Sequence, residues 1–347
     1  MKKVLVALSG GVDSACACIL LQKQGYEVAG ATMLLRDGGE AEAEDARLAA
    51  RQLGIPFYLF ELKDEFQKNV IAPFAEVYRS GGTPNPCVVC NRTMKFGIFL
   101  EKALTLGYDA IATGHYAKIF EREGRYLLSG ADDRAKDQTY VLCMLNQYQL
   151  AHTLFPLGDV RNKAQVRELA VQAGLQLAGK HDSQDICFVP DGDYMGYLTA
   201  HGLTPQRGNY ILSDGTVLAP HKGMEAYTTG QRRGLGIALG ERTYVLGKRG
   251  TDVVLGAEEA LYARRVLVRG VNYIPFDRPP QPIRVQAKLR YTTKFADALL
   301  TPAEDGCELL FDAPQRAVTP GQTAVFYDGD LVIGGGTIEK TLTEEET

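Results

Sequence analysis

The chain has 347 residues, which is too long for one small domain and suggests two or three domains of about 100 to 200 residues each. Hydrophobic residues make up 45% and charged residues 23%, a composition that excludes a disordered chain, and no run approaches the length of about 18 apolar residues that a membrane span needs. Met1 to Leu8 lacks the long apolar region of a secretory signal, so we expect a cytoplasmic protein.

The charge of the chain is unevenly distributed. The net charge of −4 argues against nucleic-acid binding, but residues 194–300 hold 15 Lys and Arg against 8 Asp and Glu. Residues 301–347 hold 2 Lys and Arg against 10 Asp and Glu. A polyanion would therefore bind the middle of the chain, unless these charges form only a solvated surface.

Apolar runs alternate with helical patterns in the first half of the chain. The predicted strands are 3–8, 28–34, 56–60 and 110–113, and the predicted helices are 15–24, 42–53 and 94–106. A charged turn at 121–125 predicts a hairpin between 117–120 and 126–129. This alternation predicts an α/β fold with a doubly wound parallel sheet, whose ligands bind at the carboxyl ends of the strands.

After about residue 189 the sequence becomes rich in glycine and in short strand-like runs. The clearest runs are 265–268, 283–289, 307–311, 323–327 and 331–334. Short runs between Pro, Gly and Asp turns predict a small β-barrel or sandwich. We therefore expect an α/β domain over 1–193, a small mixed or all-β domain over 194–262 and a C-terminal β-barrel over 263–347.

A glycine loop separates the first predicted strand from the first predicted helix. Its sequence is Ser9-Gly10-Gly11-Val12-Asp13-Ser14. Free backbone N–H groups and the positive helix end attract phosphate at such a place, although the loop is neither a Walker A motif nor a dinucleotide motif. Asp13 would repel phosphate unless a cation lies between them, so we predict that it binds Mg²⁺ through the phosphates. The alternative is a plain strand-to-helix turn.

The seven cysteines have no repeated spacing, which argues against a disulfide scaffold. Cys87 and Cys90 lie among prolines and asparagines, which predicts an ordered loop rather than a helix. The positive end of the helix that follows favours thiolate over thiol. Cys187 follows a polar stretch, whereas the remaining four cysteines read as core or strand residues and a zinc site lacks a second pair.

The glycine loop resembles the PP-loop of the ATP-pyrophosphatases, which split ATP into AMP and pyrophosphate to activate an oxygen. With the cysteine motifs included, the chain resembles the tRNA-specific 2-thiouridylases over nearly its whole length. The motifs that carry this resemblance are Ser9 to Ser14, Thr83 to Phe96 (TPNPCVVCNRTMKF), Ala112 to Tyr116 (ATGHY), Lys136 to Tyr140 (KDQTY), Asp182 to Phe188 (DSQDICF) and Thr229 to Gly236 (TGQRRGLG).

The resemblance implies an enzyme that puts sulfur on C2 of the wobble uridine, position 34, of tRNA. Its first domain would be a catalytic domain of the adenine nucleotide alpha-hydrolase-like type, and its central domain would contact the anticodon stem-loop. The uridine would be adenylated by ATP with Mg²⁺, giving AMP and pyrophosphate. Cys187 would carry a persulfide and Cys90 would act as the nucleophile, leaving a disulfide between them.

The same resemblance assigns two sets of binding residues. The residues expected to bind ATP are Ala7, Leu8, Ser9, Gly10, Gly11, Val12, Asp13, Ser14, Met33 and Gly114. The residues expected to face tRNA are Asn85, Pro86, Cys87, His115, Lys136, Asp137, Gln138, Arg290, Tyr291 and Gln322. The sulfur donor would be a cysteine desulfurase or a sulfur-relay protein.

The chain departs from the family pattern at Cys87, where many relatives have an aspartate that has been thought to move protons. Cys87, Cys90 and Cys187 would also be enough to hold a [4Fe–4S] cluster with one open iron. The stretch from Met33 to Asp45 is shorter than usual, which bears on any lid or sulfur-carrier contact there. Two other functions stay open: an amide-forming ligase with the same loop, and a non-catalytic RNA-binding relative.

Overall fold

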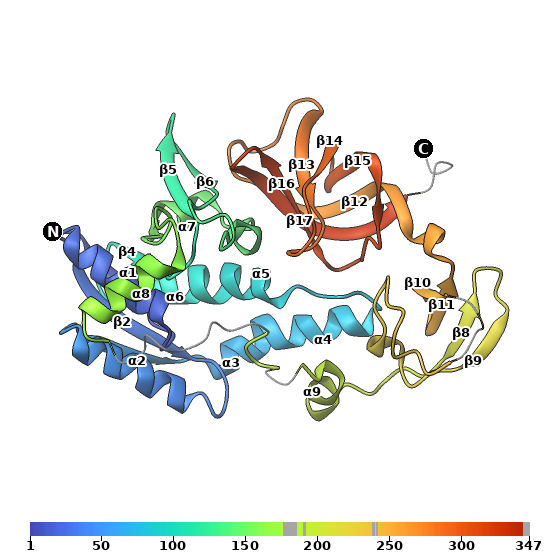
Figure 1. The fold of residues 1–347 in the computed structure, drawn as a ribbon, viewed down its shortest axis with the longest axis horizontal. Coiled ribbons are helices and arrows are strands. Elements are labelled where there is room, and N and C mark those ends of the chain that lie inside the picture. Colours follow the sequence, from blue (N-terminus) through green and yellow to red (C-terminus); the bar gives the residue numbers. More distant parts are fainter. Residues whose placement is uncertain (176–185, 190–191, 238–239, 241, 343–347) are drawn as a thin grey trace. The chain divides into compact units, whose positions relative to one another are not determined.

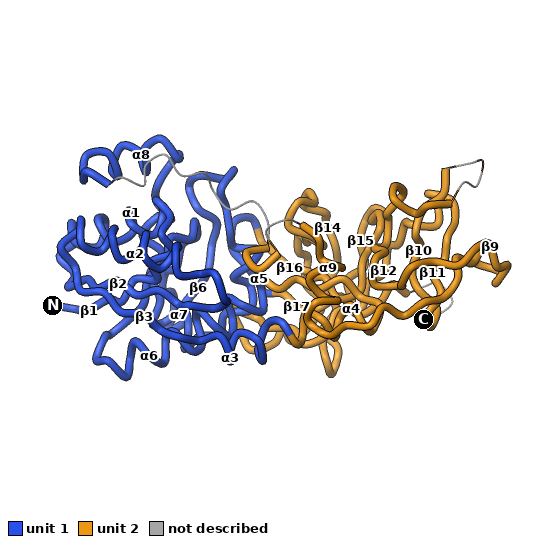
Figure 2. The backbone as a smooth tube through the Cα atoms, turned by 90° about the horizontal axis from the view of Figure 1, so that it is seen from below, with its two compact units in different colours: residues 1–71, 87–184, 329–334 blue, residues 72–86, 185–328, 335–347 orange. Residues whose placement is uncertain are grey.

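The computed structural model describes residues 1–175, 186–189, 192–237, 240 and 242–342, and Figure 1 labels its helices and strands. Contacts divide the chain into two compact units, which Figure 2 draws in different colours. The first unit comprises residues 1–71, 87–184 and 329–334, and the second comprises residues 72–86, 185–328 and 335–347. Each unit is described separately below.

The first unit is built on a five-stranded parallel sheet of order β3-β2-β1-β4-β7. Its strands are β1 (Lys3–Ala7), β2 (Glu27–Leu34), β3 (Phe57–Glu61), β4 (Ala110–Ala112) and β7 (Thr153–Leu154). After β1 the chain forms β2 and β3 on one side of this strand, and then β4 on the other side. The loops after β1 and β4 therefore meet at the point where the strand order reverses, which is where open α/β sheets bind ligands.

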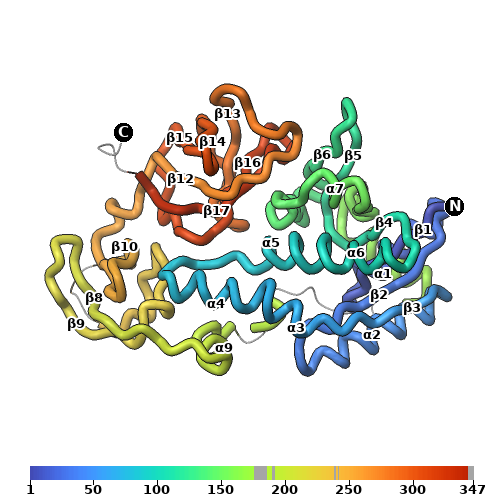
Figure 3. Tube along the Cα trace, turned by 180° about the vertical axis from the view of Figure 1, so that it is seen from behind, coloured from blue at the N-terminus to red at the C-terminus, as the bar shows by residue number. Residues whose placement is uncertain are grey.

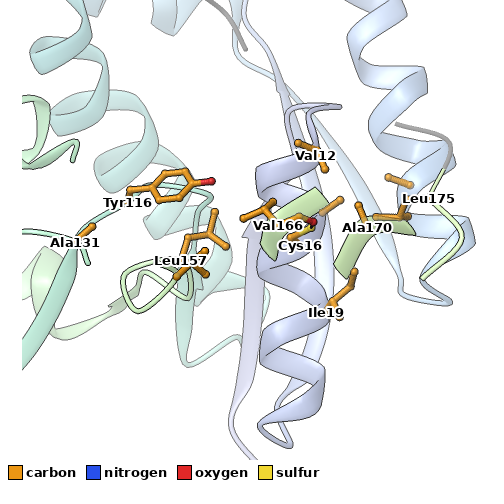
Figure 4. Close-up of a cluster of buried hydrophobic side chains, with 12 residues drawn as sticks. Val12, Cys16, Ile19, Tyr116, Ala131, Leu157, Val166, Ala170 and Leu175 are labelled. Carbon is orange, nitrogen blue, oxygen red and sulfur yellow. The ribbon is translucent and has the colours of Figure 1, made fainter. Parts of the chain in front are cut away.

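Helix α1 (Val12–Lys23) is buried on two sides, because one side faces the sheet and another faces α8 (Lys163–Gln172). Ala17, Cys18 and Leu21 pack with strand residues such as Val4. Cys16 and Ile19 pack instead against Val166 and Ala170 of α8, and Figure 4 shows this contact. Burial on both sides explains why an apolar helix follows the glycine loop, and it anchors that loop to the core.

The remaining elements of this unit include the predicted helix at 42–53 and the predicted hairpin, together with short helices that were not predicted. The helical segments are α2 (Glu40–Gln52), α3 (Lys63–Phe66), η1 (Gln67–Ile71), η3 (Thr139–Leu142) and α7 (Gln147–Ala151). The predicted hairpin is present as β5 (Lys118–Arg122) and β6 (Arg125–Ser129). Asn146 caps α7 with a capping box, in which its side chain accepts from the backbone N–H of Gln149 at 2.8 Å.

The cysteine motif differs from its prediction, because Cys87 and Cys90 lie on a helix and not in a loop. Helix α5 (Pro86–Cys90) continues through the π-helical segment η2 (Asn91–Ile98) into α6 (Phe99–Thr105), as Figure 3 shows. Proline is well accommodated at a first helical position, where its missing N–H costs no hydrogen bond. The prolines and asparagines therefore mark the start of a helix.

The second unit begins with α4 (Ala72–Arg79) and contains two sets of strands. A four-stranded sheet of order β10-β11-β8-β9 is formed by β8 (Asn209–Leu212), β9 (Val217–Pro220), β10 (Tyr244–Arg249) and β11 (Asp252–Gly256). Short helices flank it, namely α9 (Tyr194–Ala200), η5 (Met224–Ala226) and η6 (Glu258–Leu261). Tyr210, Tyr227 and Val245 contribute to the core of this small domain.

The C-terminal strands form a closed antiparallel barrel of order β12-β15-β14-β13-β16-β17, which a pairing of β12 with β17 closes. The strands are β12 (Tyr262–Tyr273), β13 (Ile283–Lys288), β14 (Ala296–Ala303), β15 (Gly306–Arg316), β16 (Thr323–Asp328) and β17 (Leu331–Leu342). The predicted fold class, an α/β domain followed by a small central domain and a β-barrel, is confirmed. In the part of the chain that the structure describes, every helix is too short or too polar to cross a membrane.

Candidate functional site

The glycine loop after β1 has the geometry of an anion site. Gly10 has a φ of +71°, and a Cβ there would lie 2.9 Å from the carbonyl oxygen of Glu42. The hydroxyl of Ser14 accepts from the backbone N–H of Ser9 at 3.2 Å and donates to the carbonyl of Gly11 at 3.0 Å. Gly11 is the N-cap of α1 and has no side chain with which to cap the first N–H groups. The loop is thus held from within, and its helix end attracts negative charge.

Two neighbouring segments hold this loop in place. The hydroxyl of Thr32 on β2 donates to the carbonyl of Leu8 at 2.7 Å. Gly114, in the loop after β4, lies so close to α1 that a Cβ would meet the backbone N of Ser14 at 2.8 Å. Met33 is half-buried near the end of β2 and pairs with Phe60 of β3. Backbone from β1, β2 and β4 therefore converges at one sheet edge.

Asp13 is bound by two residues to which the sequence analysis assigned no role, Lys163 and Tyr116. The ammonium of Lys163, at the start of α8, donates to both carboxylate oxygens of Asp13 at 2.7 Å. The hydroxyl of Tyr116 donates to Oδ1 of Asp13 at 2.8 Å. The side chains of Lys163 and Asp13 are 16% and 27% exposed, so the ion pair is partly shielded from water. The N-cap Asn162 is a visible sequence signal for α8, but only the tertiary fold brings Lys163 to the loop.

The Lys136–Gln138 segment is connected to the same cluster through Tyr116. The side-chain oxygen of Gln138 accepts from the backbone N–H of Tyr116 at 3.0 Å, and the N–H of Gln138 donates to the carbonyl of Tyr116 at 3.0 Å. The carboxylate of Asp137 accepts from the backbone N–H groups of Ala131 at 2.9 Å and Thr139 at 3.1 Å. Asp137 and Gln138 thus fix the loop around them, and Lys136 is half-buried beside them.

His115 lies in the interior, only 8% exposed, between the rings of Phe96 and Phe155. Its Nδ1 is hydrogen-bonded to the hydroxyl of Thr113 at 2.7 Å. Burial, with a smaller contribution from the charge of Lys95, lowers the pKa of His115 well below its usual value. His115 is therefore a neutral, packed side chain in this structure.

The cysteines fall into two groups by exposure. Cys87 is exposed and Cys90 half-buried on α5, and Cys187 is exposed in the second unit next to Phe188, whose ring packs against Phe74. The other four, Cys16, Cys18, Cys143 and Cys307, are buried, as expected for the first three from their apolar stretches. Burial raises the pKa of Cys16 and of Cys307 to about 12, which keeps both as inert thiols.

Two of the residues expected to face tRNA make several contacts within the second unit. The guanidinium of Arg290 donates to the carbonyl oxygens of Thr229 at 3.2 Å and Ala317 at 3.0 Å, and also to the Thr319 hydroxyl. The amide of Gln322 donates to the carbonyls of Thr83 and Pro84 at 3.1 Å each. Tyr291 instead has an exposed ring, which the ammonium of Lys288 approaches to 5.6 Å.

The described residues around Asp13 do not by themselves make a metal site. Both oxygens of the Asp13 carboxylate already accept from an ammonium, which would repel a second cation. Within neither unit do the described residues bring together three His, Cys, Asp or Glu side chains that could hold a metal ion. Cys87 and Cys90 belong to the first unit and Cys187 to the second. Part of the 182–188 motif lies outside the described residues.

These features define a class of protein: an α/β nucleotide-binding domain with an anion-attracting loop at its switch point, followed by a small β domain and a β-barrel. Family models match each part, described as the tRNA methyl transferase HUP domain over residues 2–191, its PRC-barrel domain over 197–254 and the aminomethyltransferase beta-barrel domain over 263–338.

Curated relatives match almost end to end. The chain is 48% identical to the tRNA-specific 2-thiouridylase MnmA 2 of Clostridium tetani, over 97% of this chain and 99% of that protein. It is 46% identical to MnmA of Clostridium botulinum, over 98% and 99% of the two chains. The chain belongs to the family of tRNA-specific 2-thiouridylases, as its motifs predicted.

Proposed function

We propose that this chain is a tRNA-uridine 2-sulfurtransferase. It transfers sulfur from a protein persulfide to C2 of the wobble uridine at position 34, through an adenylated uridine, and releases AMP and pyrophosphate. The observation that carries this proposal is the match to 2-thiouridylases over nearly the whole chain, including both the glycine loop and the cysteine motifs. RNA-binding activity alone would not require the cluster around Asp13.

The glycine loop suits the first step, in which the C2 oxygen attacks the α-phosphorus of ATP and pyrophosphate leaves. The first N–H groups of α1 and the ammonium of Lys163 would stabilise the negative charge that develops on the leaving pyrophosphate. Ala7 to Ser14 and Gly114 would hold the phosphates, and Met33 would lie near the adenine. Because Asp13 forms no metal site of its own, Mg²⁺ stays a prediction, and no step here depends on it.

The second step replaces the activated oxygen with sulfur. The thiolate of Cys90 attacks the inner sulfur of the Cys187 persulfide, which releases sulfide and forms a Cys90–Cys187 disulfide. The sulfide attacks C2 of the uridine, and AMP leaves with the original oxygen. A thiol reductant then restores both cysteines. The exposure of Cys87 and Cys187 and the partial exposure of Cys90 are compatible with this chemistry, in contrast to the four buried thiols.

Recognition of tRNA would use side chains of the first domain and of the C-terminal domain. Asn85 to Cys87 and Lys136 to Gln138 would face the target nucleotide, whereas Arg290 and Tyr291 would supply a cation and a stacking ring from the C-terminal domain. His115 and Gln322 resemble positions tied to the choice of tRNA. The exposed ring of Tyr291 beside Lys288 is suited to stacking on an unpaired base. A desulfurase or relay protein would load Cys187. The [4Fe–4S] cluster on Cys87, Cys90 and Cys187 stays the alternative form of sulfur delivery.

Substitution of the proposed persulfide carrier tests the function. In Cys187→Ser, we expect no 2-thiouridine, because the sulfur has no carrier, whereas tRNA-dependent exchange of pyrophosphate into ATP continues at about the wild-type rate. Thiolation by added protein persulfide and exchange of labelled pyrophosphate are measured side by side. Full thiolation by Cys187→Ser would refute its role. Wild-type enzyme that thiolates tRNA when purified without iron excludes the cluster.

A further inference from the structure

The segment Ser80–Asn85 joins α4 to α5, the helix that carries Cys87 and Cys90, and it has no regular structure of its own. Its first residues are held by the end of α4, since the N–H of Gly82 donates to the carbonyl of Val77 at 2.8 Å. Thr83 and Pro84 come next and lie beyond the reach of that helix. Their backbone must be fixed by other parts of the protein, because polar groups that lose water need partners.

The partner is a turn of the C-terminal barrel, Thr319–Gln322, which we call the barrel turn. The N–H of Thr83 donates to the carbonyl of Pro320 at 2.9 Å. The amide nitrogen of Gln322 donates to the carbonyls of Thr83 and Pro84, at 3.1 Å each. Because proline has no N–H, these three bonds account for every backbone donor and acceptor of Thr83 and Pro84. Both hydrogens of one amide group are used on two successive carbonyls.

The two backbones also approach too closely for side chains. Gly321 has a φ of +89°, and a Cβ there would lie 3.0 Å from both the N and the O of Thr83. A Cβ on Gly82 would lie 3.1 Å from the carbonyl oxygen of Pro320. A contact this close fixes the position and direction of the backbone at Gly82 and Thr83, in addition to the hydrogen bonds.

The barrel turn is itself held rigidly. Gly321 and Gln322 exchange backbone hydrogen bonds with Ile338 of β17, at 2.8 Å each. Thr319 is 3% exposed, and its hydroxyl donates to the carbonyl of Ala317 at 2.9 Å and accepts from the guanidinium of Arg290. Arg290 thus supports the turn that grips Thr83 and Pro84.

We infer that Gln322 is a positioning residue, which fixes the backbone of Thr83 and Pro84 and so sets the start of the cysteine-bearing helix α5. The inference rests on the proposed function, in which Cys90 must meet a sulfur and an activated base. It gives Gln322 a role in the enzyme without RNA, separate from any contact with tRNA. The C-terminal barrel then contributes to sulfur transfer by fixing the backbone that precedes α5.

Three substitutions of Gln322 separate this role from the others. Gln322→Glu keeps the shape but replaces the donors with an acceptor that faces two carbonyl oxygens. Gln322→Ala removes the donors, and Gln322→Lys keeps donors while changing the shape. A role through donated hydrogen bonds predicts the order Lys, Ala, Glu from least to most impaired, whereas a role through shape places Glu nearest to wild type.

The first measurement is hydrogen exchange of the peptide that contains Thr83, in the full chain without RNA or ATP. We expect exchange of the Thr83 N–H to be about tenfold faster in Gln322→Glu, because the part-buried carbonyls of Thr83 and Pro84 lose their donors and the segment loosens. Gln315→Glu is the matched control, since the amide of Gln315 donates to the carbonyl of Ala313, two residues away on the same strand. Unchanged exchange in Gln322→Glu overturns the inference.

The second measurement is thiolation kinetics. We expect kcat to fall by about 10- to 100-fold in Gln322→Glu with KM for tRNA nearly unchanged, because misplacement of a reacting group by about 1 Å has effects of that size. A rise in KM alone, with wild-type exchange at Thr83, would assign Gln322 to RNA binding and overturn the inference. If Gln322→Glu fails to fold, equal rates for the Lys and Ala variants overturn it instead. Failure of the wild-type chain to thiolate tRNA would refute the proposed function and leave the hydrogen-exchange result standing.

Discussion

Asp13 and Lys163 show how one ion pair changes the interpretation of a nucleotide loop. An acid beside a phosphate site predicts a bridging cation, and the cation present in the structure is an ammonium from α8, 2.7 Å from both carboxylate oxygens. The pair is partly buried, so its charge is screened less by solvent than that of an exposed pair. Lys163 can therefore neutralise Asp13 and attract phosphate from the same position.

Removal of this ammonium is expected to weaken ATP binding. In Lys163→Met the carboxylate of Asp13 is left uncompensated and repels the phosphates, so we predict a rise in KM for ATP of about tenfold or more. Adding Asp13→Asn should recover part of the loss. Pyrophosphate exchange at varied ATP measures both variants, with Lys23→Met, which alters an exposed lysine near the end of α1, as control. An unchanged KM in Lys163→Met would contradict this role.

His115 predicts a dependence of stability on pH. Because burial lowers its pKa in the folded state, the unfolded chain binds more protons below the ordinary pKa of about 6.5. The contribution of His115 is thus fully present above that pH and is lost as the pH falls toward the folded pKa, by about 1.4 kcal/mol per pH unit. Urea unfolding at several pH values gives the free energy of unfolding as a function of pH. This free energy should fall less steeply with decreasing pH in His115→Asn than in the wild type. Equal slopes would contradict the predicted coupling.

Part of the candidate site could be predicted from the sequence. The glycine loop and the three cysteines Cys87, Cys90 and Cys187 were found because each lies in a short motif of neighbouring residues. Lys163 and Tyr116 could not be predicted, since they reach Asp13 from 150 and 103 positions away in the chain. The amide of Gln322 likewise reaches Thr83 across the fold of the second unit.

At the scale of the elements, the loops after β1 and β4 act together. Gly114 is the contact point between them, and any side chain there would displace the start of α1 from the loop. The predicted strands and helices of the sheet were correct because apolar runs and helical spacing are local signals. The prediction of a loop at Cys87 and Cys90 was wrong, because the pair Asn85-Pro86 is as typical of the start of a helix as of a loop.

Gly114→Ala is expected to weaken ATP binding. Its Cβ would lie 2.8 Å from the backbone N of Ser14, so α1 must shift and its first N–H groups leave their positions. We predict that the stabilisation of the chain by ATP against thermal unfolding falls by more than half. Gly247→Ala is the control, since a Cβ at Gly247 meets no atom within 4 Å. Full stabilisation of Gly114→Ala by ATP would show that the contact has no role.

At the scale of the whole molecule, the sequence predicted the order of α/β domain, small domain and barrel. The proposed limits at 1–193, 194–262 and 263–347 stay a prediction, and contacts group the chain differently, because residues 72–86 pack with the later strands. Residues 329–334 in turn group with the first unit, where Leu331 pairs with Ser129 of β6. Periodicity detects each strand, but it does not tell which distant segment a strand will contact.

An RNA substrate needs positive charge for its phosphates and aromatic rings for its bases. Residues 194–300 have an excess of basic residues, and the ring of Tyr291 is exposed. An amide-forming ligase would instead need a source of ammonia. The two functions also differ in the use of Cys187, which only sulfur transfer requires. The nature of the product therefore separates the two functions.

The most direct test is mass spectrometry of nucleosides from tRNA that lacks the modification, after incubation with the enzyme, ATP, Mg²⁺ and a protein persulfide. We predict 2-thiouridine at position 34, with one AMP and one pyrophosphate formed for each sulfur transferred. ATP cleavage that depends on ammonia, or thiolation without AMP formation, would contradict the account.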